Sequence, residues 1–239
     1  MAVTTTLHSL AILTPRDQRL LRALADVTLA PASLVEGALF DGRQPAGRKR
    51  VVTLAARGLV EVLHVDPSAL PGGHRGARLL ALAPGGAEAA AALGATPLTG
   101  AAQRAASVLA GAVVAVAEAY FAMLETVLES GGGTWTVRPD LPARGGHEAP
   151  DGAWALARSA SWRESVIYDL DLPGRSYAQV AARLQEWSAY RGGGPTVTVN
   201  YVTPGDARRK CIADLAAGLE GVATGHPAAV TREVFGTPD

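Results

Sequence analysis

The sequence predicts a mixed α+β protein in two parts, and three observations support this prediction. Residues 10–97 contain three short helical patterns followed by two alternating, strand-like runs. Residues 100–225 follow the order helix, three strands, helix, strand, helix, which is typical of a sheet covered by helices. The chain has 239 residues, 48% hydrophobic and 18% charged, so it is long enough to bury a substantial core.

Three helices are predicted in the first part. The first begins in "LTPRDQRLLRAL", where Thr14 is a favourable N-cap, Pro15 occupies the first helical position and Asp17 lies in the first turn. The second is the short segment "PASLVEGALF". The third is "GRKRVVTLAARGLVEV", which is entered at Pro45 and ends at Gly58, a residue suited to the position after a helix.

A two-stranded hairpin is predicted after these helices. The run "LVEVLHV" alternates in strand fashion, "DPSALPGGHRG" has the composition of a turn, and "ARLLALAP" forms the return strand. Three short helices followed by a hairpin are the order of a winged helix-turn-helix, in which the third helix enters the major groove of DNA. One more helix and a linker complete this part near residue 97.

The third predicted helix carries several basic residues. On a helical wheel Val51, Leu54 and Ala55 cluster on one side, and most of the basic residues fall opposite them. Arginine suits guanine edges and phosphates because its fork donates two parallel hydrogen bonds. The residues expected to contact double-stranded DNA are Arg43, Arg48, Lys49, Arg50, Thr53, Arg57, His74, Arg75 and Arg78.

Two other interpretations of this helix stay open. Charged residues opposite an apolar stripe are what any solvated surface helix shows. Some winged helices bind protein partners, so the first part could also be an interaction adaptor that binds no nucleic acid.

The charge distribution limits how strongly DNA could be held. Lys+Arg and Asp+Glu are both 22, although residues 1–100 hold ten basic against seven acidic residues. Five or six phosphate contacts would give modest, salt-sensitive binding, so a homodimer is expected. The long Ala/Val-rich helix predicted over 101–129 is interpreted as core of the second part, with a dimer surface as the alternative.

Several classes of protein are excluded by composition. The single Cys211 excludes an internal disulfide framework and a cysteine-rich zinc site. The start "MAVTTTLHSLAIL" lacks the basic and apolar regions of a signal peptide. The most apolar run is interrupted by Glu118 and is mostly alanine and valine, which falls short of a membrane span. We therefore expect a cytoplasmic protein without membrane contact.

The strands of the second part are predicted in "TWTVRPDL", "GAWALA", "SVIYDLDL" and "PTVTVNYVTP", and its later helices in "SYAQVAARLQEWSAYR" and "DARRKCIADLAAGLEG". With "LTPRDQRLLRAL…LVEGALF…RKRVVTLAARGLVEV", "APDGAWAL" and "VIYDLDLPGRSYAQVAARLQEWSAY", the chain resembles the bacterial replication-relaxation family of plasmid and mobile-element proteins over most of residues 13–205. The resemblance implies a winged helix joined to a restriction-endonuclease-like domain. It also implies a role in plasmid replication and DNA relaxation, with replication or conjugation proteins as partners.

Active nucleases of that fold hold Mg²⁺ with an Asp and a second acidic residue, and a Lys positions the attacking water. By resemblance, Asp151 and Asp169 match the two acidic positions, Asp171 stands in place of the Lys, and Arg183 is a nearby basic candidate. Because the Lys is missing, the leading interpretation is a non-catalytic, cofactor-free DNA-binding protein that acts as a transcription regulator or replication accessory. A Mg²⁺-dependent nickase using these four residues is the alternative.

Overall fold

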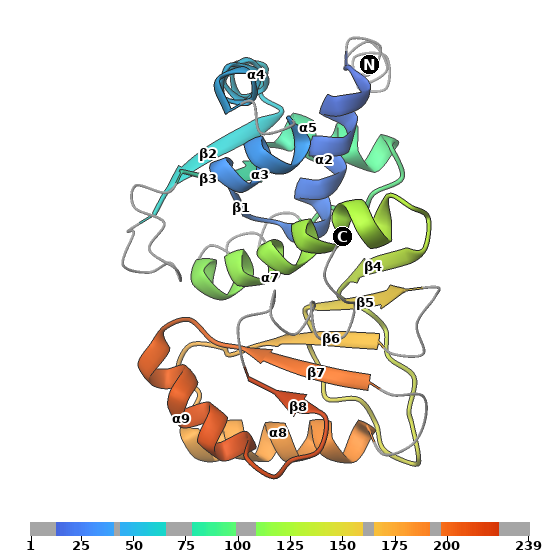
Figure 1. Cartoon of the computed structure of the whole chain (residues 1–239), viewed down its shortest axis with the longest axis vertical. Helices are drawn as coiled ribbons and strands as arrows, with labels where there is room; N and C mark the ends of the chain where they lie inside the picture. The colour runs from blue at the N-terminus through green and yellow to red at the C-terminus, as the bar shows by residue number, and fades with distance from the viewer. Residues whose placement is uncertain are drawn as a thin grey trace.

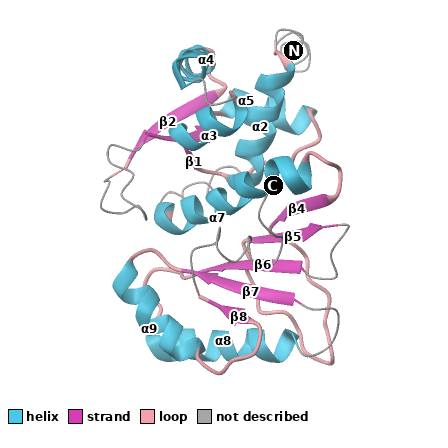
Figure 2. Cartoon of the chain, viewed as in Figure 1, coloured by secondary structure: helices cyan, strands magenta, loops and turns pink. Residues whose placement is uncertain are grey.

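The computed structural model describes residues 13–40, 44–65, 78–98, 109–159, 165–191 and 197–224. Over these ranges the chain is a mixed α+β protein with seven α-helices, one π-helical turn and two sheets, of three and five strands. Figure 1 shows the smaller sheet and its helices in the upper half and the larger sheet in the lower half, and Figure 2 distinguishes helices from strands. The predicted mixture of helix and strand is confirmed.

The N-terminal part contains four helices around a small antiparallel sheet with the strand order β1-β3-β2. Its elements are α2 (Pro15–Val27), β1 (Ala30–Pro31), α3 (Ala32–Leu39), α4 (Gln44–Ala56), β2 (Val60–His64), β3 (Arg78–Leu82) and α5 (Pro84–Ala92). All three predicted helices and both hairpin strands are present. Strand β1 was not predicted, because two residues leave no alternating pattern in the sequence.

The predicted helix ends are confirmed. The Thr14 hydroxyl accepts a hydrogen bond from the Asp17 N–H at 3.2 Å, and the Asp17 carboxylate accepts one from the Thr14 N–H at 2.8 Å. Such a capping box satisfies N–H groups that a helix leaves free at its start. At the end of α4, Gly58 has φ +68°, a conformation that favours glycine, and its N–H donates to the carbonyl of Ala55 at 2.9 Å.

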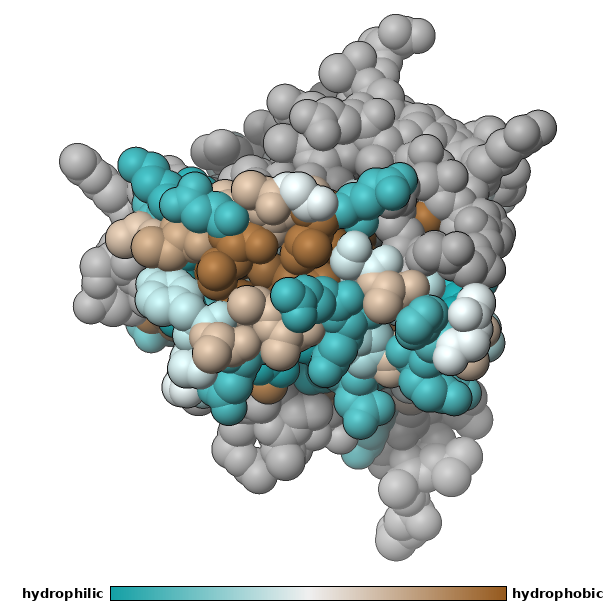
Figure 3. Space-filling model, turned by 90° about the horizontal axis from the view of Figure 1, so that it is seen from below, coloured by the Kyte–Doolittle hydropathy of each residue, from teal (hydrophilic) through white to brown (hydrophobic). Residues whose placement is uncertain are grey.

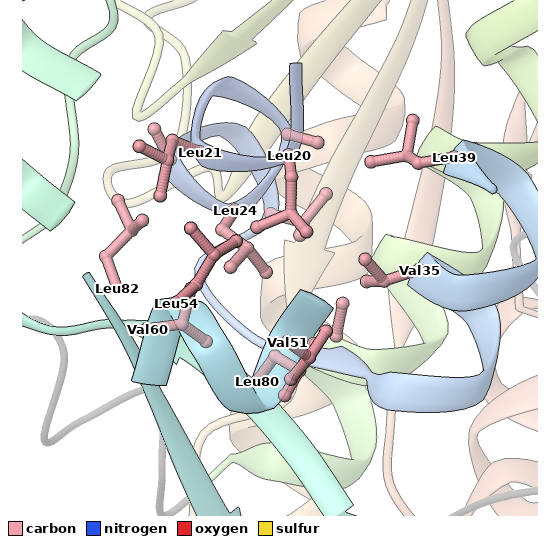
Figure 4. Close-up of a cluster of buried hydrophobic side chains, with 14 of the residues drawn as sticks. Leu20, Leu21, Leu24, Val35, Leu39, Val51, Leu54, Val60, Leu80 and Leu82 are labelled. Carbon is pink, nitrogen blue, oxygen red and sulfur yellow. The ribbon is translucent and has the colours of Figure 1, made fainter. Parts of the chain in front are cut away.

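The core of this part lies where α2, α3 and α4 meet the sheet, as Figure 4 shows in close-up. Each helix contributes leucine or valine side chains that are almost completely buried, and the strands contribute the rest. The labelled members are Leu20, Leu21, Leu24, Val35, Leu39, Val51, Leu54, Val60, Leu80 and Leu82. This core fixes the orientation of α4, because Val51 and Leu54 anchor one of its sides.

Helix α7 (Ala110–Met123) and the π-helical turn η3 (Leu124–Leu128) connect the two parts. Within α7 every residue except Glu118 and Ala122 is buried. Ala117 and Tyr120 pack into the N-terminal core, whereas Val116 belongs to a second core that includes the larger sheet. The apolar surface that could have formed a homodimer contact is therefore used inside the chain; residues 101–108, the predicted start of this helix, lie outside the described ranges.

The C-terminal part is a mixed five-stranded sheet with the order β4-β5-β6-β7-β8. Strands β4, β5 and β6 are antiparallel, whereas β6, β7 and β8 are parallel. The elements are β4 (Gly133–Val137), β5 (Ala155–Ser159), β6 (Ser165–Leu170), α8 (Tyr177–Arg191), β7 (Val197–Val202), α9 (Asp206–Ala216) and β8 (Val222–Ala223). The predicted order is confirmed, with β8 added.

The two faces of this sheet are covered by different helices. Tyr168 and Leu170 of β6 pack with α7, whereas Ile167 packs with Trp187 of α8 on the other face. Asp169 follows the same alternation and points towards α8. Figure 3, seen from below, shows apolar residues on the outer surface of this end of the molecule, with hydrophilic residues on either side of them.

In the described ranges no helix combines the length and the apolar character that crossing a membrane requires.

Candidate nucleic-acid interface

Helix α4 lies at the outer edge of the N-terminal part, on the opposite side from α7 and the larger sheet (Figure 1). Val51 and Leu54 are fully buried. Gly47 also faces inward, because a Cβ at this position would lie 3.1 Å from the Glu36 side chain and 3.2 Å from the Phe40 ring. These three residues set the rotation of the helix about its axis, and hence the side chains that it exposes.

The outward face of α4 carries cations that form no ion pair with any other described residue. Arg48, Lys49 and Thr53 are exposed on the helix, and Arg57 is exposed just after it. The Thr53 hydroxyl donates to the carbonyl of Lys49 at 3.0 Å. A shallow hollow on this face is lined by Pro45, Arg48, Lys49, Val52 and Thr53.

Arg50 does not lie on this outward face of α4. The sequence predicts it on the outward face, whereas in the structure its Nε donates to Oδ1 of Asp17 at 2.7 Å and its Nη2 bonds the other oxygen. Asp17 is completely buried. Burial alone would raise the pKa of Asp17, but the hydrogen bonds from Arg50 and Thr14 outweigh it, so that this pKa lies below its ordinary value. Arg50 therefore ties α4 to the start of α2.

The predicted hairpin contacts are only partly described. Arg78 of β3 has its Nη2 3.5 Å from Oε1 of Glu36, a carboxylate that is almost fully buried in α3. This ion pair holds the arginine against the helices. Arg43, His74 and Arg75 lie outside the described residues.

The acidic residues of the C-terminal part do not form one site. The buried carboxylate of Asp169 accepts from Nε of Arg183 at 2.7 Å and from Nε1 of Trp187 at 2.6 Å. Nη2 of Arg183 also donates to the backbone carbonyl of Asp151 at 2.5 Å. Arg183 thus bonds the carboxylate of Asp169 and the backbone of Asp151 at once, whereas the Asp151 side chain is exposed.

Asp171 is buried in a separate cluster. Arg208 of α9 bonds both of its oxygens, and the hydroxyls of Thr203 and Tyr201 donate to it at 2.8 and 3.2 Å. Arg175 in turn donates to the Tyr201 hydroxyl at 3.0 Å. The carboxylate is therefore held by neighbouring side chains on both oxygens.

These residues do not fit a Mg²⁺ ion. A divalent cation needs carboxylate oxygens that are free to coordinate it, whereas Asp169 and Asp171 are each bonded to an arginine. Across the described ranges, no three His, Cys, Asp or Glu residues are grouped so that they could hold a metal. The four residues of the nuclease alternative are thus held by ion pairs and hydrogen bonds among themselves and their neighbours.

Arg138 is a residue that the sequence did not single out. It has φ +48°, which is uncommon for a side chain other than glycine, and its guanidinium lies 4.2 Å from the centre of the Trp154 ring. Burial lowers its pKa, opposed by the charge of Asp169. This arginine adds a further cation beside the acidic residues, and nothing local in "TVRPDL" specifies its partners.

A cleft between α2, α3 and the end of α7 contains a partly buried acid, Asp26. It is lined by Arg19, Arg22, Asp26, Leu39, Tyr120, Leu124, Leu128 and Glu129. The Tyr120 hydroxyl donates to Asp26 at 2.9 Å, and Nε1 of Trp135 donates to the Asp26 backbone carbonyl at 3.2 Å. Burial raises the pKa of Asp26 to about 6, although Tyr120 and Arg22 favour its charged form.

The raised pKa of Asp26 predicts a pH-dependent loss of stability. The ordinary value is 3.8, so between pH 4 and pH 6 the folded chain holds a proton that the unfolded chain has lost. The free energy of unfolding should therefore fall as pH rises through this window, by up to about 3 kcal/mol. Asp26→Asn keeps an acceptor for Tyr120 and removes this effect, so the variant should be the more stable protein at pH 7.

Urea denaturation of both proteins from pH 4 to pH 8 tests this expectation. The stability difference should grow between pH 4 and pH 6 and then level off. An equal stability difference at every pH would contradict the raised pKa of Asp26.

No protein-family model, no curated protein and no solved structure matches the chain.

Proposed function

We propose that the N-terminal part is a winged helix-turn-helix that binds duplex DNA with α4 in the major groove. The chain order α2, β1, α3, α4, β2, β3 and the sheet order β1-β3-β2 support this assignment. The observation on which the proposal depends is the outward face of α4. There Arg48 and Lys49 are exposed and form no ion pair with other described residues.

The outward face of α4 is better suited to binding a polyanion than the face of an ordinary solvated helix is. An ion pair with a nearby carboxylate stabilises a surface cation only slightly. The chain as a whole has as many acidic as basic residues, so acidic partners for such pairs are available in it. Acidic side chains are nevertheless absent from α4 itself, over Gln44–Ala56. Arg48 and Lys49 then donate to phosphates or guanine edges, while Thr53 offers a hydroxyl. A second copy on an adjacent half-site adds affinity that one helix does not supply.

For the C-terminal part we propose a restriction-endonuclease-like fold that has lost cleavage. The order α7, β4, β5, β6, α8, β7 and the switch from antiparallel to parallel pairing at β6 support it. Arg183 and Arg208 are paired with Asp169 and Asp171, so these acids are not free to hold a metal for cleavage. This favours a role of the C-terminal part in assembly or in a further DNA contact. Together with the resemblance to replication-relaxation proteins, this supports a regulator or replication accessory of a mobile element.

The test is fluorescence anisotropy of a labelled duplex titrated with the full chain across a salt series. Arg48→Glu with Lys49→Glu should weaken binding by about 100-fold, because two cations that meet DNA become repulsive. The slope of log affinity against log salt should become shallower by about 2, since two phosphate or base contacts are lost. Both positions are exposed, so the melting temperature should stay within about 2 °C of the wild-type value.

A matched control keeps the same change in net charge away from α4. Arg209→Glu with Lys210→Glu alters the surface of α9, at the opposite end of the molecule in Figure 1. The only described ion pair that it breaks is the solvent-exposed one between Arg209 and Asp206. This control should bind DNA nearly as well as wild type. Equal losses in both double variants would indicate a general charge effect, and no binding by wild type at low salt would remove the DNA-binding proposal.

A further inference from the structure

One apolar side chain interrupts the polar face of α4. Val52 is 58% exposed, whereas Val51 and Leu54 on the same helix are fully buried. Arg48 and Lys49 precede it by four and three residues, so all three side chains share one face of the helix. Val52 also lines the shallow hollow together with both cations and Thr53.

The fold itself gives no reason for valine at this position. A β-branched residue is a weaker helix former than alanine or lysine, and on an exposed face no packing compensates for that. Single exposed apolar residues are ordinary on protein surfaces. Val52 differs from them in its position, at the centre of the face that Arg48 and Lys49 present.

We propose that Val52 recognises the 5-methyl group of a thymine in the major groove, an inference that rests on the proposed DNA-binding function. Among the four base-pair orientations, thymine is distinguished there by this apolar methyl, which a small apolar side chain can cover. Arg48 lies four residues away, about 6 Å along the axis, and base pairs rise about 3.4 Å. The ligand is therefore duplex DNA in which a guanine lies one or two base pairs from that thymine.

The experiment has two stages and uses the full chain. Random-sequence duplexes are first selected with wild type, Val52→Ala and Val52→Thr. The wild type should enrich one T·A position that Val52→Ala no longer enriches. Threonine keeps a methyl on its β-carbon, so Val52→Thr should retain the preference. Since position 52 is exposed, none of these changes should alter the folded structure.

Affinity is then measured on the selected duplex with deoxyuridine replacing that one thymine, which removes only the methyl. Wild type should bind about fourfold more weakly, the loss expected for one buried methyl-sized group. Val52→Ala should bind both duplexes equally. This pattern supports the thymine contact.

The contrary outcomes separate the two proposals. If wild type binds a selected site but tolerates deoxyuridine at every thymine, the assignment of Val52 is wrong and the DNA-binding function stands. Enrichment of the same motif by wild type and Val52→Ala leads to the same conclusion. If no duplex is enriched and none is bound at low salt, both proposals are wrong.

Discussion

Arg50→Met is expected to lower the free energy of unfolding by about 3–5 kcal/mol. The variant leaves Asp17 fully buried without its bidentate partner, and an unpaired buried charge is among the most destabilising single changes. Methionine keeps much of the length of the side chain, so the loss reflects the charge more than a cavity. Urea denaturation at pH 7 measures the effect, and thermal melting should shift by about 10 °C.

The pH dependence of this loss identifies its cause. The pKa of Asp17 is lowered in the folded chain from its ordinary value of 3.8. Its paired carboxylate therefore stabilises the fold at pH values above 3.8. That stability is lost as pH falls through the lowered pKa. The difference between wild type and Arg50→Met should therefore narrow below pH 4, where Asp17 becomes protonated.

Two controls distinguish this structural role from a contact with DNA. Adding Asp17→Asn to Arg50→Met removes the stranded charge and should recover part of the lost stability. Arg57→Met, at an exposed position after α4, should leave stability within about 0.5 kcal/mol. An Arg50→Met variant that is as stable as wild type but no longer binds DNA would show that Arg50 contacts DNA.

The orientation of α4 shows how far a sequence pattern can be followed. The helix, its start near Pro45 and its end at Gly58 are predictable, because capping and glycine conformation are local properties. The helical wheel also places Val51 and Leu54 on the inner side, where the structure buries them, but it places Arg50 outward, which is wrong. The position of Arg50 is decided by its ion pair with Asp17, 33 residues away in the chain.

The same limit applies in the C-terminal part. The strands around Asp151 and Asp169 follow from alternation and turn residues, and the sequence places Arg183 on the helix after them. It does not indicate that Arg208, on a helix beyond the next strand, bonds Asp171. Side chains that meet through the sheet leave no periodic signal in the sequence. Residue type therefore left a metal site open as an alternative, whereas tertiary contacts pair Asp169 and Asp171 each with an arginine.

Asp169→Ala is expected to destabilise the C-terminal part by about 3–5 kcal/mol. Arg183, whose side chain is 11% exposed, and the fully buried Trp187 both donate to this carboxylate. Removing the carboxylate leaves the N–H groups of Arg183 and Trp187 without their acceptor, and it leaves the charge of Arg183 without its partner. Urea denaturation followed by tryptophan fluorescence measures the effect. Asp169→Asn keeps an acceptor and loses only the charge, so its loss should be smaller.

Asp151→Ala is the matched control, because Arg183 bonds the backbone carbonyl of Asp151 and the side chain is exposed. Its stability should change by less than about 0.5 kcal/mol. The same proteins incubated with supercoiled plasmid and Mg²⁺ or Mn²⁺ test the nuclease alternative, and we expect no nicking by any of them. Nicking by wild type that is lost in a folded Asp169→Asn protein would show that the arginine leaves the acid during turnover, and that the domain cuts DNA.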